Sequence, residues 1–305
     1  MTIVPTTGRH RGVDEVGVQA RAAKFWARSI KSSSQLAALE LAISMTDLTT
    51  LEGDDSPGKV RSLCLKSVYP DPEDASCPAV AAVCVYPDRV PLAREALAAL
   101  GAGGRKPAVA SVAGAFPSGR SSSVVRLADV RDAVQAGADE IDMVIDRGAF
   151  LAGHYGQIVD DVASVVEAAG KAHVKAILET GELGNLQAVR TAAWAAMEGG
   201  AHFIKTSTGK ISPAATPEAV LVMLEAAREY AHVAGRQVGV KAAGGIRSAK
   251  DAVRYLIMVG ETVGEGWLDP AWFRFGASTL LNDLVMQRTH CRTGVYPGPD
   301  YVSIT

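Results

Sequence analysis

In residues 203–210, FIKTSTGK, two apolar residues lead into Lys205, and a turn of small hydroxyl residues follows. The pattern indicates a short buried strand that ends at the lysine. Burial removes water from an ammonium group, and apolar neighbours do not repay that loss. Lys205 is therefore either held by a structural ion pair or kept there because a lowered pKa makes its amine a nucleophile. The octet alone leaves both possibilities open.

The ending Gly209-Lys210 does not belong to a nucleotide-binding phosphate loop. That loop needs a glycine five positions before its second glycine, and Ser or Thr directly after the lysine. Those two positions hold Ile204 and Ile211, so the nucleotide-loop interpretation fails at both.

The strand at 203–205 is one of a series in which short apolar runs alternate with longer segments of helical periodicity. We expect strands at 44–49, 80–86, 108–113, 139–145, 173–179, 201–206, 237–242 and 272–276. Helical segments are expected near 56–68, 89–100, 121–136, 156–170, 185–198, 217–233, 248–258 and 278–289. This alternation requires parallel strands joined by helical crossovers. With no GxGxxG turn after residue 49, it predicts an α/β fold with a single (β/α)8 TIM barrel rather than a doubly wound sheet.

The chain is expected to have three parts: an N-terminal extension at 1–35, the barrel at 36–290 and an irregular tail at 291–305. Val18, Ala22, Phe25 and Trp26 recur at helical spacing, which predicts an amphipathic helix over 14–31. Its apolar stripe must be covered, and we expect it to pack on the bottom or flank of the barrel or on a second subunit, away from the chemistry. A second helix over 34–43 leads into the first strand.

Composition excludes several classes of function. The chain has 305 residues, is 48% hydrophobic and carries a formal net charge of −2, which gives no support for a nucleic-acid partner. It has neither a run of about 18–20 apolar residues nor the apolar core of a signal peptide, so no membrane association is expected. Four cysteines without CxxC spacing and six scattered histidines predict a reduced, cytoplasmic protein with no metal site and no cofactor.

Polar and charged side chains gather at the carboxyl ends of the expected strands, where barrel enzymes carry their chemistry. The residues concerned are Asp47 and Thr49, Glu140 and Asp142, Glu179, Lys205 and Lys241. Two lysines and an aspartate at the ends of the fourth, sixth and seventh strands are harder to explain as a structural ion pair than one inward charge. Lys175 has the same strand parity as Glu179 but lies deeper, and we expect it to pair with a buried carboxylate.

The seventh and eighth strands are followed by glycine-rich turns. Gly244-Gly245 exposes backbone N–H groups, and Ser278 and Thr279 begin a helix whose positive end favours an anion. Barrel enzymes often bind phosphate at this place. We therefore expect a phosphorylated substrate beside a reactive lysine.

Together, several motifs between Leu36 and Leu284 resemble the deoxyribose-phosphate aldolase family. They are MTDLTTL, VCVYP, GADEIDMVID, ILETGEL, AHFIKTSTGK, VGVKAAGGIRSAKDA and RFGASTLL. The resemblance implies a (β/α)8 barrel without a metal, and reversible cleavage of 2-deoxy-D-ribose 5-phosphate to acetaldehyde and D-glyceraldehyde 3-phosphate through a lysine Schiff base. It is also consistent with a homo-oligomer, with a dimer favoured.

Position by position, the resemblance implies that Lys205 forms the Schiff base, Lys241 is its neighbouring lysine and Asp142 is the aspartate of the proton relay. It further implies substrate contacts from Asp47, Thr49, Gly209, Lys210, Gly244, Gly245, Gly276, Ser278 and Thr279. Cys84 is expected to be a spectator. A tail tyrosine, Tyr296 or Tyr301, is expected to approach the site. Many members have proline where this chain has Ala242, which bears on the stiffness of that loop.

The two lysines should differ in pKa. They are expected to end adjacent strands about 4.8 Å apart, where each ammonium disfavours the charge of the other. A phosphate at Gly244-Gly245 would favour the charged form of Lys241, so we expect Lys205 to be the nucleophile. The alternatives are another Schiff-base aldolase, or a catalytically silent barrel that binds a sugar phosphate.

Overall fold

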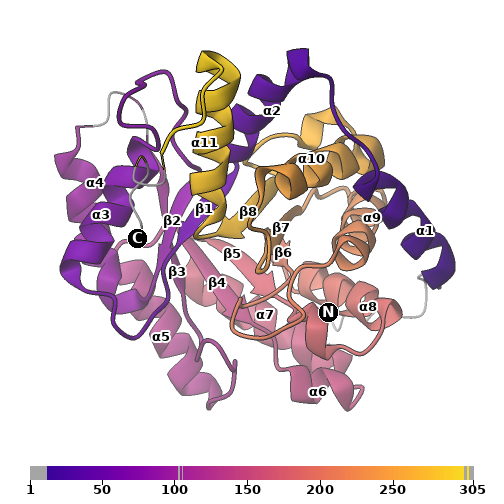
Figure 1. Ribbon diagram of the computed structural model, residues 1–305. Coiled ribbons are helices and arrows are strands. Elements are labelled where there is room, and N and C mark those ends of the chain that lie inside the picture. The colour runs from indigo at the N-terminus through magenta and orange to yellow at the C-terminus, as the bar shows by residue number, and fades with distance from the viewer. Residues whose placement is uncertain (1–11, 102–103, 105, 299–300, 302–305) are drawn as a thin grey trace.

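The computed structural model describes residues 12–101, 104, 106–298 and 301. Eight parallel strands close into a barrel in sequence order, with helices around it (Figure 1). The strands are β1 (Thr46–Thr49), β2 (Ala82–Val85), β3 (Ala108–Val112), β4 (Glu140–Val144), β5 (His173–Ile177), β6 (Phe203–Lys205), β7 (Gly239–Ala243) and β8 (Phe273–Ala277). All eight predicted strands are present, and the predicted (β/α)8 barrel is confirmed.

Each crossover between strands contains a helix. The helices are α1 (Glu15–Trp26), α2 (Ser32–Ser44), α3 (Pro57–Val68), α4 (Val90–Ala99), α5 (Ser123–Gln135), α6 (Arg147–Leu151), α7 (Tyr155–Ala169), α8 (Leu186–Glu198), α9 (Pro217–Ala234), α10 (Ala249–Val263) and α11 (Leu280–Thr293). Many begin at a side chain that caps a free backbone N–H group, such as Ser56 before α3 and Thr216 before α9. The short helix α6 was not predicted. Among the described residues, no helix is both long and apolar enough to cross a membrane.

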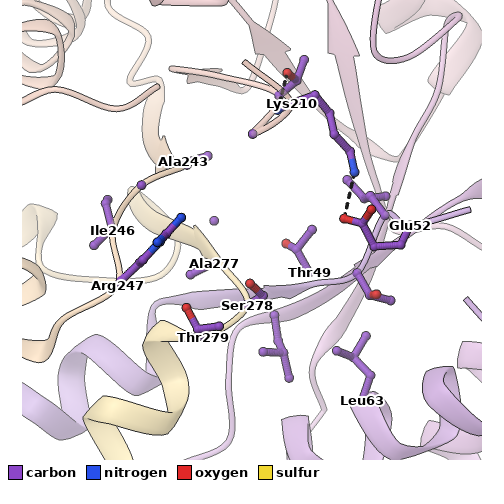
Figure 2. Close-up of a pocket in the computed structure, with 18 of the residues that line it drawn as sticks. Thr49, Glu52, Leu63, Lys210, Ala243, Ile246, Arg247, Ala277, Ser278 and Thr279 are labelled. Atoms are coloured by element: carbon purple, nitrogen blue, oxygen red, sulfur yellow. Dashed lines mark hydrogen bonds and ion pairs between the residues drawn. The ribbon is translucent and has the colours of Figure 1, made fainter. Parts of the chain in front are cut away.

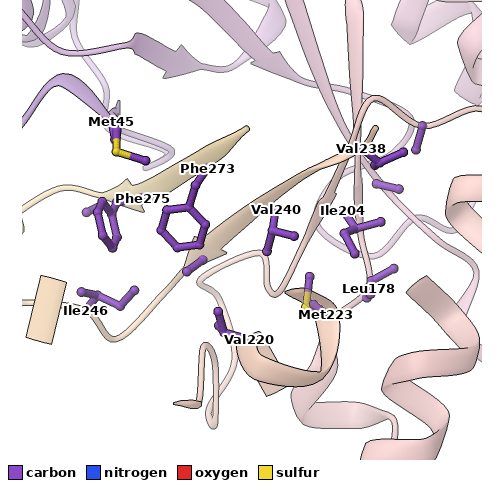
Figure 3. Packing of buried hydrophobic residues seen from close by; sticks show 14 of the residues in the cluster. Met45, Leu178, Ile204, Val220, Met223, Val238, Val240, Ile246, Phe273 and Phe275 are labelled. Atoms are coloured by element: carbon purple, nitrogen blue, oxygen red, sulfur yellow. The ribbon is translucent and has the colours of Figure 1, made fainter. Parts of the chain in front are cut away.

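The strands direct alternate side chains to two different environments. Ile204 and Val240 are buried in the hydrophobic core together with Val220 and Met223 of α9 (Figure 3). The next residue along each strand is a lysine, Lys205 or Lys241, which must therefore point into the barrel. The lysines are direct partners in the pairing of β6 with β7. The two-residue period that buries the aliphatic face thus brings the ammonium groups together.

The N-terminal helix α1 packs on the flank of the barrel, against α9 and α10 (Figure 1). Val18 and Ala22 are buried, and the Trp26 ring meets Tyr255 of α10 edge-on, with centroids 4.8 Å apart. The expected coverage of the apolar stripe is confirmed. The next helix, α2, runs from Ser32 to Ser44 and so crosses residue 35, the boundary we expected for the extension.

The prediction that a tail tyrosine lies at the site is wrong for the two described tyrosines. The Tyr296 ring stacks on His290, and its hydroxyl donates to Gln287. The Tyr301 hydroxyl donates to Asp71, which precedes β2 and lies at the amino end of the strands. The physical reason is the direction of α11, which returns the chain from the carboxyl end of β8 to the opposite end of the barrel.

Candidate active site

Three lysines share the carboxylate of Asp142 inside the barrel. Nζ of Lys205 lies 2.8 Å from Oδ2 of Asp142, and Nζ of Lys241 lies 2.9 Å from the same oxygen. The other oxygen, Oδ1, accepts a hydrogen bond of 2.9 Å from Lys175. The contacts join strands β4 to β7, so the barrel closure assembles a cluster from residues up to 99 positions apart.

The cluster continues toward the amino end of the barrel. Lys175 also donates to Glu140 at 2.5 Å, and Arg274 of β8 donates to Glu140 at 3.2 Å. Asp47 of β1 accepts from Arg274 at 2.6 Å and pairs with Nζ of Lys241 at 2.6 Å. The predicted pairing of Lys175 with a buried carboxylate is therefore confirmed. We call these seven residues the barrel ion cluster: Asp47, Glu140, Asp142, Lys175, Lys205, Lys241 and Arg274.

The charges of the barrel ion cluster balance when Lys205 is neutral. Each of the seven residues is at most 8% exposed, so net charge cannot be offset by bulk water. Three carboxylates face three cations, namely Lys175, Lys241 and Arg274, and Lys205 is the fourth basic group. A buried charge without a partner is costly, so protonating Lys205 adds an uncompensated positive charge.

The pKa directions agree with this charge count. Burial lowers the pKa of Lys205, and the Lys241 ammonium lowers it further against the opposing effect of Asp142. Burial also acts to lower the pKa of Lys241, but the carboxylates of Asp142 and Asp47 outweigh it and raise that pKa above its usual value. The expected difference in pKa is present, although the anions that keep Lys241 charged are carboxylates of the barrel.

Above the cluster lies a cavity of about 330 Å³ at the carboxyl ends of the strands (Figure 2). Among the described residues that line this cavity, Lys205 is the one member of the barrel ion cluster. Predicted residues that line it are Thr49, Lys205, Gly209, Lys210, Gly244, Gly245, Gly276, Ser278 and Thr279. Lys241, Asp142 and Asp47 are fully buried beneath it. Asp47 was predicted to bind substrate, but in the structure its carboxylate pairs with Lys241 and Arg274 inside the barrel.

Hydrogen bonds fix the loop that follows β6. The Thr206 hydroxyl donates to the carbonyl of Ala243 at 3.0 Å and accepts from its N–H at 2.9 Å, which ties the ends of β6 and β7 together. The Thr208 hydroxyl donates to Glu179 at 2.5 Å. Glu179 is fully buried and has a φ of 55°, which is uncommon for a residue with a side chain. These contacts hold the Gly209-Lys210 turn at the cavity.

At two positions of the cavity wall, Gly244 and Gly276, the neighbouring atoms leave no room for a side chain. Gly244 has a φ of 87°, and a Cβ there would lie 2.6 Å from Cβ of Ala214. A Cβ on Gly276 would lie 2.7 Å from Cβ of Ala243 and 3.0 Å from Cε of Lys241. Beside Gly276, Ser278 and Thr279 precede the first turn of α11, whose first backbone N–H groups have no partner within the helix. The wall thus offers backbone donors and a positive helix end to an anion.

Sequence reasoning missed five polar residues at this cavity: Thr50, Glu52, Lys59, Thr208 and Arg247. Arg247 stands two positions after Gly245, at the end of a turn already identified as an anion site, and that spacing could have revealed it. Cys84 is fully buried within the barrel, and burial raises the pKa of its thiol to about 11. The thiol is therefore neutral near pH 7, and its expected spectator role is still a prediction.

Residues 41–285 match the model of the DeoC/LacD family aldolases. The chain is 44% identical to the deoxyribose-phosphate aldolase of Homo sapiens over 293 residues, which covers 93% of this chain and 91% of that protein. It is also 44% identical to the enzyme of the same name from Mus musculus over 294 residues, with the same coverage.

In three dimensions the chain is similar to a tetrameric deoxyribose phosphate aldolase from Aeropyrum pernix, with a TM-score of 0.64 and 24% identity. The similarity covers 87% of this chain and all of that one, and at this identity it shows the shared fold. The family match extends over the whole barrel, from α2 to α11. The chain belongs to the DeoC/LacD family of aldolases.

Proposed function

We propose that this chain is a deoxyribose-phosphate aldolase, a lyase that cleaves 2-deoxy-D-ribose 5-phosphate reversibly to acetaldehyde and D-glyceraldehyde 3-phosphate. The observation that carries the proposal is the position of Lys205. It is the basic group that the barrel ion cluster does not need for charge balance, and it lines a cavity that also has a wall suited to a phosphate. The names of the relatives support the same activity.

In the proposed reaction, the neutral amine of Lys205 adds to the C1 aldehyde of the open-chain sugar, and loss of water gives an iminium ion. The iminium draws electrons from the C2–C3 bond as a base takes the proton from the C3 hydroxyl. Cleavage releases glyceraldehyde 3-phosphate and leaves an enamine on the lysine. Protonation of the enamine carbon and addition of water then release acetaldehyde and regenerate the amine.

Asp142 and Lys241 are suited to charge stabilisation and proton transfer in these steps. The Asp142 oxygen that lies 2.8 Å from Nζ of Lys205 can stabilise the positive charge of the iminium as it forms. Lys241 contacts the same oxygen and stays protonated, so it keeps the Asp142 carboxylate ionised and able to accept a proton. We propose that a bound water carries protons between this pair and the substrate.

The phosphate end of the substrate would lie against Lys210, the Gly244-Gly245 turn and the start of α11. These groups are remote from the C2–C3 bond. Their binding energy can hold the open-chain sugar with its aldehyde at Lys205, which favours reaction over mere binding. In this assignment Thr49 contacts the substrate, while Asp47 acts from below the cavity by holding Lys241.

We further propose that the protein is cytoplasmic and forms a homo-oligomer, with a dimer favoured. The free state of the described cysteines Cys64, Cys77, Cys84 and Cys291 supports a reducing compartment. We also propose that residues 36–290 carry the activity, with 1–35 and 291–305 as extensions. Sedimentation of the purified chain measures the oligomeric state directly.

Borohydride reduction in the presence of acetaldehyde tests the proposed chemistry. An aldolase of this kind should give a two-carbon adduct on Lys205, detectable by mass spectrometry of the digested protein. A parallel assay should show glyceraldehyde 3-phosphate released from 2-deoxyribose 5-phosphate. A silent sugar-phosphate-binding barrel would give neither adduct nor product, and a different Schiff-base aldolase would give an adduct without this product.

A further inference from the structure

One wall of the cavity carries an acidic side chain, Glu52, at the place where the phosphate of the proposed substrate would bind. Oε1 of Glu52 lies 2.9 Å from Nζ of Lys210, and both residues line the cavity. In Figure 2, this pair lies on one side of the cavity and Arg247 on the other, with Ser278 between them. The proposed phosphate ligand Lys210 is therefore already engaged by a carboxylate.

The loop between β1 and α3 holds Glu52 at this position. Asp55 is 5% exposed and accepts a hydrogen bond of 3.0 Å from the backbone N–H of Glu52. It also accepts one of 2.7 Å from the Thr50 hydroxyl and pairs with Nζ of Lys59 at 2.7 Å. The backbone of Glu52 is thus anchored, while its side chain remains 61% exposed and free to turn.

A sugar phosphate and the Glu52 carboxylate compete for the same ammonium group. Phosphate monoesters carry nearly two negative charges near neutral pH and accept stronger hydrogen bonds than a carboxylate does. An exposed ion pair contributes little free energy, so the phosphate can displace Glu52 from Lys210. The displaced carboxylate nevertheless stays on the same short loop, where it repels the bound dianion.

We propose that Glu52 sets the affinity of the phosphate end of the site by competing with the substrate phosphate for Lys210. This inference rests on the proposed function and adds to it a residue that limits affinity. When the phosphate leaves, Lys210 regains a partner at once, which favours release of the phosphorylated three-carbon product. Glu52 is then a determinant of KM for phosphorylated sugars, and it acts little on sugars without phosphate.

The substitution Glu52→Gln tests the proposal, with Asp54→Asn as the matched control. Asp54 lies on the same loop, and its side chain is 87% exposed and pairs with Lys59, whereas Glu52 pairs with Lys210. Both substitutions remove one negative charge with little change of shape. For Glu52→Gln we expect KM for 2-deoxyribose 5-phosphate to fall by roughly two- to fivefold. KM for unphosphorylated deoxyribose should stay the same, and Asp54→Asn should leave both values near those of the parent.

Binding of inorganic phosphate provides a measurement that does not depend on turnover. Calorimetry should show tighter phosphate binding for Glu52→Gln by a similar factor, and the difference should shrink at high salt. Unchanged phosphate binding and an unchanged KM would overturn the inference, as would an equal effect of Asp54→Asn. If the chain turned over no deoxyribose 5-phosphate while phosphate binding still tightened, the proposed function would fail and the role of Glu52 would stand.

Discussion

Lys205 and Lys241 are in register on adjacent strands and both contact Oδ2 of Asp142, at 2.8 and 2.9 Å. Their surroundings differ in one respect that decides their protonation. Lys241 has a second carboxylate, Asp47, at 2.6 Å, whereas Lys205 lines the cavity. The lysine with two anionic partners keeps its proton, and the lysine that faces the substrate is the one whose pKa is lowered.

The first prediction separates the two lysines by adduct formation. Lys205→Leu should abolish the borohydride-trapped acetaldehyde adduct, because it removes the nucleophile. Lys241→Leu should retain a slow adduct on Lys205, with its optimum at higher pH, because loss of the neighbouring ammonium raises the pKa of Lys205 toward its usual value. Each unit of rise reduces the free amine at neutral pH by about tenfold.

Mass spectrometry of the trapped protein across a pH series measures this effect. Lys171→Leu, on the surface, is the control and should behave like the parent. An adduct mapped to Lys241 in the unmodified protein would reverse the assignment.

The second prediction concerns the start of α11. Ser278→Asp would place a carboxylate beside the start of α11, in the cavity that Lys210 also lines, and should raise KM for deoxyribose 5-phosphate by about tenfold or more through like-charge repulsion. Deoxyribose without phosphate should be turned over almost as before. Steady-state kinetics on both sugars make the comparison. Equal losses on the two substrates would show that Ser278 is remote from the phosphate.

The third prediction concerns α1, whose buried stripe stabilises the barrel from outside. Val18 is 1% exposed, so Val18→Ala should lower the free energy of unfolding by about 1–2 kcal/mol. Val16 lies on the same helix and is 77% exposed, so Val16→Ala should change it by less than about 0.5 kcal/mol. Urea unfolding measures both variants. Turnover by the folded enzyme should be the same in each, and a loss of turnover in Val18→Ala would connect α1 to the site.

The barrel and the ends of its strands could be predicted because they follow from local periodicity. Apolar runs gave the strands, and charged residues at their carboxyl ends gave Asp142, Lys205 and Lys241. Period-two alternation also places Arg274, between Phe273 and Phe275, inside the barrel, so its position could have been predicted in the same way. Helix α6, only five residues long, is too short to show helical periodicity.

The partners within the barrel could not be predicted, because they depend on strand register and on contacts across the interior. Nothing local indicates that Asp47 of β1 meets Lys241 of β7, and the glycine-rich turn after β7 instead suggests a phosphate as the anion that keeps Lys241 charged. The prediction of a tail tyrosine at the site was wrong for a related reason, because the direction of α11 determines which end of the barrel the tail reaches. The left-handed backbone of Glu179 likewise has no signature in the residue type.

The last prediction tests charge balance by changing cluster members that lie away from the cavity. Glu140→Gln removes a negative charge from the barrel ion cluster, so a protonated Lys205 becomes still less favourable and its pKa should fall. Lys175→Met removes a positive charge, so the pKa of Lys205 should rise. The acid limb of kcat/KM against pH should therefore move to lower pH in the first variant and to higher pH in the second. Each variant breaks a buried ion pair and should lose about 3–5 kcal/mol of stability, so melting curves define the temperature at which both are folded.

The double variant Glu140→Gln/Lys175→Met restores the count of charges, with two carboxylates facing Lys241 and Arg274. Its acid limb should return toward that of the parent. Shifts of both single variants in the same direction, or a double variant that follows either one, would show that local contacts rather than total charge determine the protonation of Lys205.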